Sequence, residues 1–325
     1  MKKLALIIGI TSQDGAYLSK YLLEKGYEVI GTARNLLNIN KLKYLKIDKE
    51  VQIIKIDLFN EGEIYKLFRS YKFNEIYNLA SQSSVAKSYL EPYTTLKFNT
   101  LSVLNILDSI RKLNYQPNFL QAVSSEIYGN SNELPITENS IINPQNTYAI
   151  SKSFAYFTVK NFRENYKLFA TNAILFNHDS FLRDENFFIK KIIMAAVAIK
   201  QGKQNEIQVG NLDIVRDFGY APSYVEAMWK ILQSDKPDDY LVCSGSMISL
   251  REIIYFVFDK LCISREKIII DPSLFRPAEI DKLYGSNSKI KKDLSWDYTT
   301  SFFDILELLI EEEVDNSNYN FKYES

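Results

Sequence analysis

The stretch LALIIGITSQDG, residues 4–15, decides how this 325-residue sequence folds. Its first five residues are a continuous apolar run, as expected for a strand that is buried on both faces of a parallel sheet. Gly9 and Gly15 then flank a short loop that leads into apolar residues at helical spacing. In such a joint the backbone amides and the helix N-terminus face a pyrophosphate. The stretch therefore predicts a dinucleotide-binding loop, with Ser12 in place of a middle glycine.

The N-terminal half continues this alternation of strand and helix patterns. Strands are predicted at residues 27–32, 51–58, 75–79, 119–124 and 169–176, and helices at 17–23, 61–71, 93–113 and 146–166. This rhythm predicts an α/β fold with a doubly wound parallel sheet over residues 1–176. Beyond residue 177 the rhythm breaks, with strands expected near 207 and 241 and helices at 224–233 and 250–261. We expect a smaller α/β substrate-binding domain over 177–315, with some chain returning to the first domain, and a polar tail at 316–325.

Composition and charge exclude several classes of protein. Lys and Arg number 39 against 40 Asp and Glu, whereas a chain whose main partner is nucleic acid usually carries a basic excess. Two cysteines and one histidine cannot build a disulfide framework or a His-rich metal site, so no metal is expected. No apolar run reaches the ~18 residues that span a membrane, and the start lacks a signal-peptide cleavage site. We expect a cytoplasmic protein that binds small molecules, with no nucleic-acid or membrane partner.

The ends of the second and third predicted strands indicate which dinucleotide binds. NAD sites usually place an acidic residue after the second strand to hold the ribose hydroxyls. This chain has Arg34 there and no acid, and a guanidinium pairs well with a 2′-phosphate. Asp57, at the end of the third strand, is placed to contact an adenine amino group. The pattern favours NADP, with NAD as the alternative.

Residues near the fifth strand and the helix at 146–166 carry the expected chemistry. Tyr148 and Lys152 stand at i and i+4 on one helix face, where a nearby ammonium makes a phenolate accessible. Ser124 and Ser125 end the fifth strand and can donate to a substrate oxygen, and Glu126 follows them. Oxidation or epimerisation of an alcohol needs no carboxylate at this place. Removing a proton next to a carbonyl needs a base, and Glu126 supplies one.

With these motifs in place, the chain resembles an extended short-chain dehydrogenase/reductase and, within that group, the GDP-mannose 4,6-dehydratase family. The resemblance rests on residues 13–18, 78–83, 124–129, Tyr148 and Lys152, 176–178, 209–213, 216–221 and 275–279. The resemblance as a whole spans positions 5 to about 296, nearly the whole chain. The resemblance implies a Rossmann-like first domain and a homodimeric or homotetrameric assembly.

The resemblance also implies an activity. The enzyme would be a GDP-sugar 4,6-dehydratase, a hydro-lyase that makes a GDP-4-keto-6-deoxy sugar by internal hydride transfer in nucleotide-sugar biosynthesis. Tyr148 takes the proton of the sugar 4-hydroxyl as hydride leaves C4, and Lys152 stabilises the phenolate and holds the nicotinamide ribose. Ser124 holds the 4-oxygen. Glu126 removes the C5 proton and helps to expel the 6-hydroxyl as water, after which hydride returns to C6.

Binding residues follow from the same resemblance. The cofactor residues are Gly9, Ser12, Gln13, Asp14, Gly15, Arg34, Asp57, Leu58, Leu79, Ala80, Tyr148, Lys152 and His178, and the substrate residues are Ser83, Ser125, Asn177, Lys191, Arg216, Arg276 and Glu279. Asn177 would hold the diphosphate, with Arg216 and Arg276 as its cationic partners. Lys191 is a further candidate cation, and Glu279 suits a ribose hydroxyl.

Four departures from the family pattern leave the sugar open. Besides Ser12, the chain has Asn35 where a second Arg is usual, Ser84 where His is usual, and Phe181-Leu182-Arg183 where Pro-Arg-Arg is usual. The last two lie near the expected sugar and subunit contacts, so GDP-N-acetylglucosamine or a GDP-heptose is an alternative to GDP-mannose. Two other functional classes stay open. A GDP-sugar epimerase or reductase would use Tyr148 but not Glu126, and a non-catalytic nucleotide-binding regulator would have no use for the Tyr–Lys pair.

Overall fold

A computed structural model describes residues 2–275 and 278–318 of the chain. Within these residues, seven parallel strands form the central sheet in the order β11-β6-β5-β4-β1-β2-β3. The strands are β1 (Leu4–Ile8), β2 (Glu28–Ala33), β3 (Gln52–Lys55), β4 (Glu75–Asn78), β5 (Asn118–Ser124), β6 (Ala170–Leu175) and β11 (Tyr240–Val242). The winding reverses between β1 and β4, which opens a crevice at the carboxyl ends of the strands. The predicted doubly wound α/β fold is confirmed.

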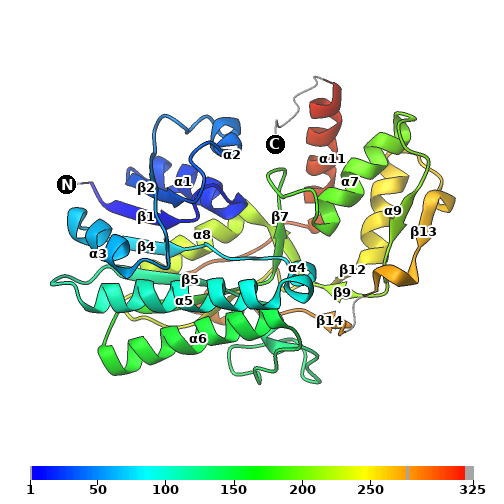
Figure 1. The fold of residues 1–325 in the computed structure, drawn as a ribbon. Coiled ribbons are helices and arrows are strands. Elements are labelled where there is room, and N and C mark those ends of the chain that lie inside the picture. The colour runs from blue at the N-terminus through cyan, green and yellow to red at the C-terminus, as the bar shows by residue number, and fades with distance from the viewer. Residues whose placement is uncertain (1, 276–277, 319–325) are drawn as a thin grey trace.

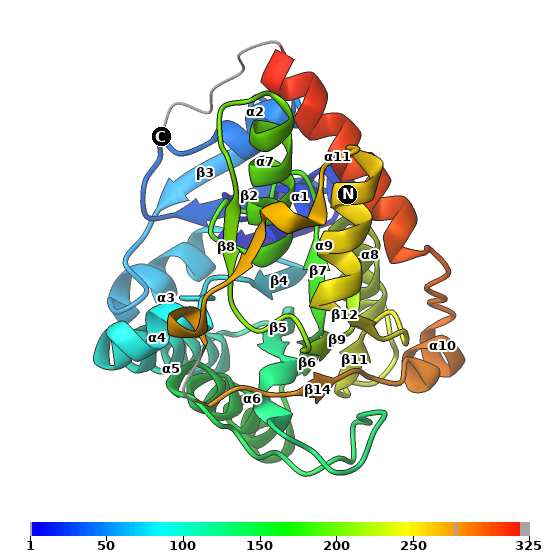
Figure 2. The same cartoon turned by 90° about the vertical axis from the view of Figure 1, so that its right-hand side faces the viewer.

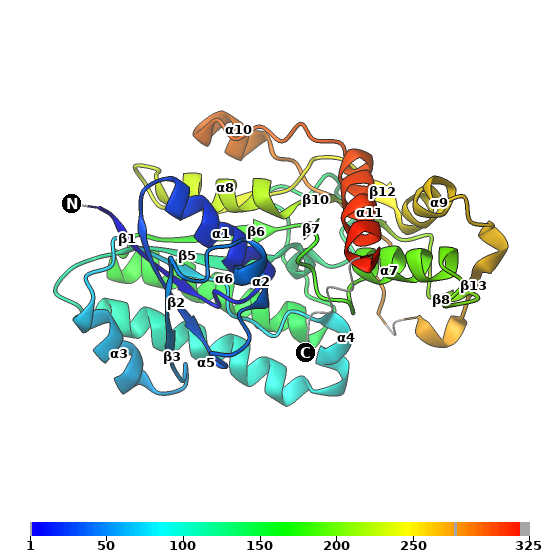
Figure 3. The same ribbon diagram turned by 90° about the horizontal axis from the view of Figure 1, so that it is seen from above.

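Helices cover both faces of this sheet (Figures 1 and 3). α1 (Gln13–Glu24) and α8 (Ala221–Leu232) pack on one face, and α3 (Glu61–Ser70), α5 (Pro92–Arg111) and α6 (Thr147–Tyr166) pack on the other. The apolar run of β1 serves both layers. Ala5 and Ile7 belong to the core with α1 and α8, whereas Leu6 and Ile8 belong to the core with α3, α5 and α6. This two-sided burial explains why the run does not alternate with polar residues.

The C-terminal part lies at the carboxyl edge of the sheet (Figures 1 and 2). Its helices α7 (Phe188–Lys200), α9 (Leu250–Lys260) and α11 (Phe302–Asn318) pack on one another, and β8 (Ile207–Val209) pairs with β13 (Ile268–Ile270). Two further small sheets join β7 (Asn177–Asp179) to β10 (Phe218–Tyr220), and β9 (Val215–Arg216) to β12 (Ile248–Ser249) and β14 (Lys282–Leu283). α8 and β11 return to the central sheet, so residues after 177 serve both parts.

Several boundaries differ from the sequence prediction. The strand expected at 51–58 ends at Lys55, because the backbone N–H of Asp57 turns away to the Glu63 carboxylate, at 3.1 Å. Residues 316–318, predicted as polar tail, continue α11. The sequence analysis named no helix at α2 (Asn40–Tyr44), α4 (Val85–Leu90), α7, α10 (Ser288–Leu294) or α11. α2, α4 and α10 span only five to seven residues, too short for a periodic pattern.

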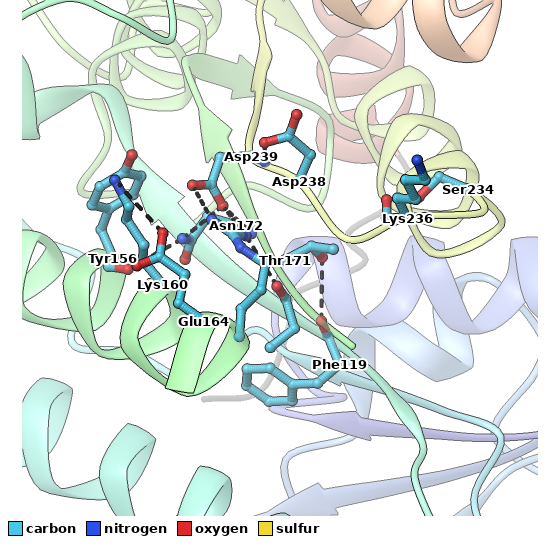
Figure 4. A network of polar contacts seen from close by, with 12 residues as sticks. Phe119, Tyr156, Lys160, Glu164, Thr171, Asn172, Ser234, Lys236, Asp238 and Asp239 are labelled. Atoms are coloured by element: carbon cyan, nitrogen blue, oxygen red, sulfur yellow. Dashed lines mark hydrogen bonds and ion pairs between the residues drawn. The ribbon is translucent and has the colours of Figure 1, made fainter. Parts of the chain in front are cut away.

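A buried acid fixes the far end of α6, the helix that carries Tyr148 and Lys152 (Figure 4). Asp239, just before β11, accepts two hydrogen bonds of 2.7 Å from the Arg163 guanidinium on α6. The same carboxylate accepts from the backbone N–H and the side-chain amide of Asn172 on β6, at 3.1 and 2.9 Å. A paired charge that is held by four donors resists displacement. These contacts hold the C-terminal end of α6 to the sheet edge.

Candidate active site

A cavity lies between the carboxyl edge of the sheet and the C-terminal part. Eleven of the residues predicted for catalysis or binding line it: Asp14, Leu79, Ser83, Ser124, Glu126, Tyr148, Lys152, Asn177, His178, Arg216 and Glu279. They come from both halves of the chain, so neither half forms the cavity alone. Among the described residues no cluster of three or more His, Cys, Asp or Glu side chains is arranged to hold a metal ion, and no helix has the length and apolarity to cross a bilayer.

The glycine loop after β1 packs too closely for any side chain at its two glycines. Gly9 has φ of +94°, and a Cβ there would lie 3.0 Å from the backbone nitrogen of Ala80. A Cβ at Gly15 would lie 2.4 Å from the carbonyl oxygen of Gly9. Ser12 caps α1, because its hydroxyl accepts from the backbone N–H of Gly15 at 3.0 Å. The tight loop and the free N-terminal amides of α1 fit the pyrophosphate of a dinucleotide.

Asp14 and His178 tie this loop to β7 through a half-buried ion pair. His178 Nδ1 donates to the carbonyl oxygen of Phe176 at 2.7 Å, and Nε2 lies 3.0 Å from both Asp14 carboxylate oxygens. Burial opposes the Asp14 charge, but the charge and hydrogen bond of His178 outweigh it and lower the pKa of Asp14 to about 2. Burial alone would lower the pKa of His178, but the charge and hydrogen bond of Asp14 outweigh burial, so the pKa of His178 is raised. Gln13 adds a second tie, since its amide accepts from Ser180 Oγ at 2.8 Å.

A second hollow lies at the ends of β2 and β3. It is lined by three predicted cofactor residues, Arg34, Asp57 and Leu58, together with Lys55, Ile56, Phe59, Glu63 and Phe98. The Arg34 guanidinium lies 5.5 Å from the centre of the Phe98 ring, a cation–π contact that leaves its outer nitrogens available. Asp57 accepts from the backbone N–H of Phe59 at 2.9 Å. The hollow suits the adenosine end of a dinucleotide.

Tyr148 and Lys152 lie together on α6, both buried. The Lys152 ammonium is 5.8 Å from the centre of the Tyr148 ring and donates to the carbonyl oxygen of Ala122 on β5, at 3.0 Å. Burial lowers the pKa of Lys152 to about 8 against the opposing charge of Asp14. Burial raises the pKa of Tyr148 to about 12, a hydrogen bond with Ser124 works in the other direction, and the Glu126 charge adds to the rise. The Lys152 ammonium therefore loses its proton more readily than an exposed lysine, whereas burial opposes ionisation of the Tyr148 phenol, so the structure does not show the easier ionisation that the nearby ammonium was predicted to give.

Glu126 enters the same cavity from a 3-10 turn, η1 (Ser125–Tyr128), directly after β5. Ser124 begins this turn, with its hydroxyl accepting from the Glu126 backbone N–H at 3.3 Å. The Glu126 carboxylate accepts from the side-chain amide of Asn146 at 3.2 Å. The sequence analysis missed Asn146, although its place at the start of the predicted 146–166 helix marks it as a cap. A phenol, an ammonium, a hydroxyl and a carboxylate thus converge on one cavity.

Some predicted residues lie elsewhere. Gln13 and Ser125 are buried and do not line the cavity. The backbone of Ala80 packs against Gly9. Lys191 donates to the carbonyl oxygen of Gln208 at 3.3 Å and lines a separate hollow between α7 and β8. Arg276 lies outside the described residues.

Of the residues that depart from the family pattern, some are buried in the core and others line the cavity. Phe181 and Leu182 are buried in the core, whereas Ser84 and Arg183 line the cavity. Asp179 also lines it. The sequence analysis gave Asp179 no role, because nothing in the spacing marked it.

A glycine loop on a doubly wound sheet, with a Tyr–Lys pair at its carboxyl edge, defines an enzyme of the extended short-chain dehydrogenase/reductase class. Among the solved structures that share the fold, two match nearly the whole chain as follows. One is the dTDP-glucose 4,6-dehydratase DesIV of Streptomyces venezuelae with NAD and TYD bound, at a TM-score of 0.87, 17% identity, and coverage of 97% of this chain and 98% of that one. The other is RMD of Pseudomonas aeruginosa complexed with NADPH, at a TM-score of 0.81, 24% identity, and coverage of 97% and 100%.

Sequence comparison specifies the family. The family described as GDP-mannose 4,6 dehydratase matches residues 6–309. A curated relative, GDP-mannose 4,6 dehydratase 2 of Arabidopsis thaliana, is 38% identical over 327 residues, covering 97% of this chain and 87% of the relative. The chain belongs to the GDP-mannose 4,6-dehydratase family.

Proposed function

We propose that this protein is a GDP-sugar 4,6-dehydratase with GDP-mannose as its nominal substrate. One observation carries the proposal beyond family membership. Glu126 shares a cavity with Tyr148, Lys152 and Ser124, so a base for a carbon acid stands beside the groups that oxidise an alcohol. A reductase or epimerase has no use for a carboxylate at that place.

The residues divide the reaction into two proton transfers. Tyr148 takes the proton of the 4-hydroxyl, Lys152 stabilises the resulting phenolate, and Ser124 holds the 4-oxygen. The 4-ketone then acidifies C5, and Glu126 takes the C5 proton. The electron pair of that C–H bond forms the C5–C6 double bond as the C6–O bond breaks, and Glu126 returns its proton to the leaving oxygen as water. When bound, a nicotinamide dinucleotide supplies the hydride acceptor for C4 and the hydride donor for C6. C5 takes up one proton in the last step, which balances the proton that Tyr148 gained from the 4-hydroxyl, so the net change is the loss of one water.

NADP is the proposed dinucleotide, with NAD as the alternative. The support comes from this chain, because the hollow at the ends of β2 and β3 presents Arg34, and β2 ends without an acid. Denaturing the purified protein and identifying the released dinucleotide tests this assignment. Release of NAD alone would overturn it and leave Arg34 as a surface residue.

The nucleotide end of the substrate is assigned to the C-terminal side of the cavity. Asn177, Arg216 and Glu279 line it there, and Arg276 is proposed with them from the sequence pattern. Arg216 is buried, and one of its guanidinium nitrogens donates to the carbonyl oxygen of Val215 at 2.9 Å. A guanidinium that is oriented in this way suits a diphosphate. Substrate binding by Lys191 stays a prediction, because Lys191 lines a separate hollow and not this cavity.

We further propose a homodimer or homotetramer in the cytoplasm, and a division of the chain into residues 1–176, a largely substrate-binding 177–315, and a short tail. Two neighbouring helices each expose an apolar stripe, Leu101 and Leu104 on α5 and Ile150, Phe154 and Phe157 on α6. Exposed apolar stripes of this kind typically become buried in assemblies. Light scattering on the wild type and on Phe157→Glu tests the assembly, since the variant should shift it toward monomer.

Product analysis by NMR decides the function. The purified protein is incubated with GDP-mannose, GDP-N-acetylglucosamine or a GDP-heptose in separate reactions. A 4-keto-6-deoxy product from any of them supports the dehydratase, and the sugar that reacts fastest identifies the substrate. An epimer or a reduced sugar without loss of water assigns a different reaction to the same site. Tight dinucleotide binding without turnover of any of the three sugars would indicate a non-catalytic protein.

A further inference from the structure

We propose that Asn146 is a positioning residue that sets the catalytic base and the Tyr148 helix in one geometry. Its side-chain amide uses one end to cap α6 and the other end to hold the Glu126 carboxylate. This inference rests on the proposed function in so far as Glu126 is the base of the dehydration.

The hydrogen bonds fix which way the amide points. Asn146 Oδ1 accepts from the backbone N–H of Ala149 at 2.8 Å, as a helix N-cap does. A backbone N–H can only donate, so the atom facing it is the amide oxygen. The other end is therefore the NH₂ group, and it donates to Glu126 Oε2 at 3.2 Å. Asn146 is 5% exposed, so water competes little for either bond.

The backbone around this amide joins the turn of Glu126 to the loop that leads into α6. The backbone N–H of Asn143 donates to the carbonyl oxygen of Ile127 at 2.8 Å. Gly129, at φ of +58°, closes the turn, and a Cβ there would lie 2.1 Å from the Asn143 carbonyl oxygen. The two segments thus approach so closely that only glycine fits between them. Asn146 lies at the end of this joint, three residues beyond Asn143.

The arrangement assigns separate tasks to the two Glu126 oxygens. Donation to Oε2 holds the plane of the carboxylate, and Oε1 is left to take the proton from the substrate. The charged and titratable groups that share the cavity with Glu126 are Tyr148, whose pKa the Glu126 charge raises, and Asp14, Lys152, His178, Asp179, Arg183, Arg216 and Glu279. None of these is bonded to Glu126 by a hydrogen bond among the described residues, so the Asn146 amide is its identified anchor.

Two variants separate the positioning role from helix capping. Asn146→Ser keeps a cap oxygen and removes the donor to Glu126. Asn146→Asp keeps the cap and the shape but sets a second carboxyl group against Glu126. Asn60→Asp is the matched control, because Asn60 caps α3 through Glu63 N–H at 3.2 Å and its amide donates to the Glu63 carboxylate at 2.9 Å. Thermal melts of all three full-length variants report the cost of altering a cap.

Three readouts test the proposal. We expect kcat of Asn146→Ser to fall about ten- to a hundredfold, the value of a hydrogen bond to a charged group, with KM nearly unchanged. In Asn146→Asp two adjacent carboxyl groups share one proton, so the acid limb of the pH–rate profile should move to higher pH by about one pH unit or more. Single-turnover absorbance of the reduced dinucleotide measures oxidation at C4, and incorporation of deuterium from heavy water measures exchange of the C5 proton. In both Asn146 variants we expect oxidation at C4 to slow much less than exchange at C5.

The outcomes distinguish this inference from the proposed function. If the wild type makes no dehydrated sugar, the proposed function fails, and a ¹³C-carboxyl titration of the unliganded protein still tests the contact. There, the signal removed by Glu126→Gln should move in Asn146→Asp and not in Asn60→Asp. If the wild type dehydrates but both Asn146 variants keep its kcat and pH profile, Asn146 is only a helix cap. Equal loss of kcat in Asn60→Asp would also overturn the positioning role.

Discussion

Replacing His178 by Phe should destabilise the fold in a way that depends on pH. The phenyl ring can keep the stacking of His178 on Tyr224, whose ring centre lies 4.5 Å away at an angle of 27°. It loses both nitrogens, so Asp14 keeps its charge without its main partner. Against the opposing effect of burial, His178 and, to a smaller extent, Gln13 and Arg183 lower the pKa of Asp14 from its ordinary value of 3.8 to about 2. At about 1.4 kcal/mol for each tenfold change in proton affinity, the pairing stabilises the folded state by roughly 2.5 kcal/mol.

The sign of each pKa change sets the pH window. The lowered pKa of Asp14 contributes stability that is present above about pH 4 and is lost as pH falls toward 2. The raised pKa of His178 contributes stability that is present below its ordinary value of 6.5 and is lost as pH rises through the higher folded value. The loss in His178→Phe should therefore be greatest between about pH 4 and 6.5. The missing bond to the Phe176 carbonyl adds roughly 1 kcal/mol at every pH.

Urea denaturation of the wild type and His178→Phe across pH 3 to 9 measures this difference. We expect a loss of about 3–4 kcal/mol on the plateau and a smaller loss on either side. Asp14→Asn combined with His178→Phe is the matched control, since it removes the stranded charge and should recover part of the loss. A loss of the same size at all pH values would show that the imidazole acts through packing alone and would refute the ion-pair argument.

Three further predictions concern the site. Glu126→Gln should abolish deuterium wash-in at C5 from heavy water while the 4-hydroxyl is still oxidised, and a variant that dehydrates near the normal rate would remove Glu126 as the base. Gly15→Ala places a Cβ 2.4 Å from the Gly9 carbonyl oxygen, so it should cost about 2 kcal/mol or more in urea and release less dinucleotide on denaturation. GDP should inhibit turnover more strongly than UDP or dTDP, and equal inhibition by all three would contradict the nucleotide assignment.

The sequence predicted the parts of the site that local patterns determine. The run at Leu4–Ile8 and the glycines at 9 and 15 specify a buried strand and a tight turn, because few other residues tolerate those contacts. Tyr148 and Lys152 share a helix face by their spacing alone. Parallel strands end at one edge, so Ser124 and Glu126 were expected beside them. The doubly wound parallel sheet and the glycine loop could therefore be predicted from the sequence, whereas the order of the strands comes from the structure.

Contacts between residues that are far apart in the sequence could not be predicted from local patterns. The amide of Asn146 meets Glu126 twenty positions away only because Gly129 lets two loops approach. Lys191 matched the family pattern as a cation, yet α7 carries it to the hollow beside Gln208. Ser125 stands in a motif of polar residues, but the tightness of η1 turns it into the core. In each case tertiary packing, which no local pattern records, determines where the side chain lies.

The structure also narrows the question of which sugar reacts. The sequence alone suggested that Ser84 and Phe181-Leu182-Arg183 lie near the sugar and subunit contacts, which left a sugar other than mannose open. Phe181 instead stacks on Tyr44, at 5.1 Å between ring centres, and Leu182 is 2% exposed, so neither adds space to the cavity. Arg183 does line the cavity and keeps a polar group there, its guanidinium lying 3.6 Å from the centre of the Phe187 ring.

The case for a sugar larger than mannose therefore rests on Ser84 alone. Since Ser84 also caps α4 through the Lys87 N–H at 3.2 Å, a small side chain there has a structural reason of its own. GDP-mannose is accordingly the first substrate to test.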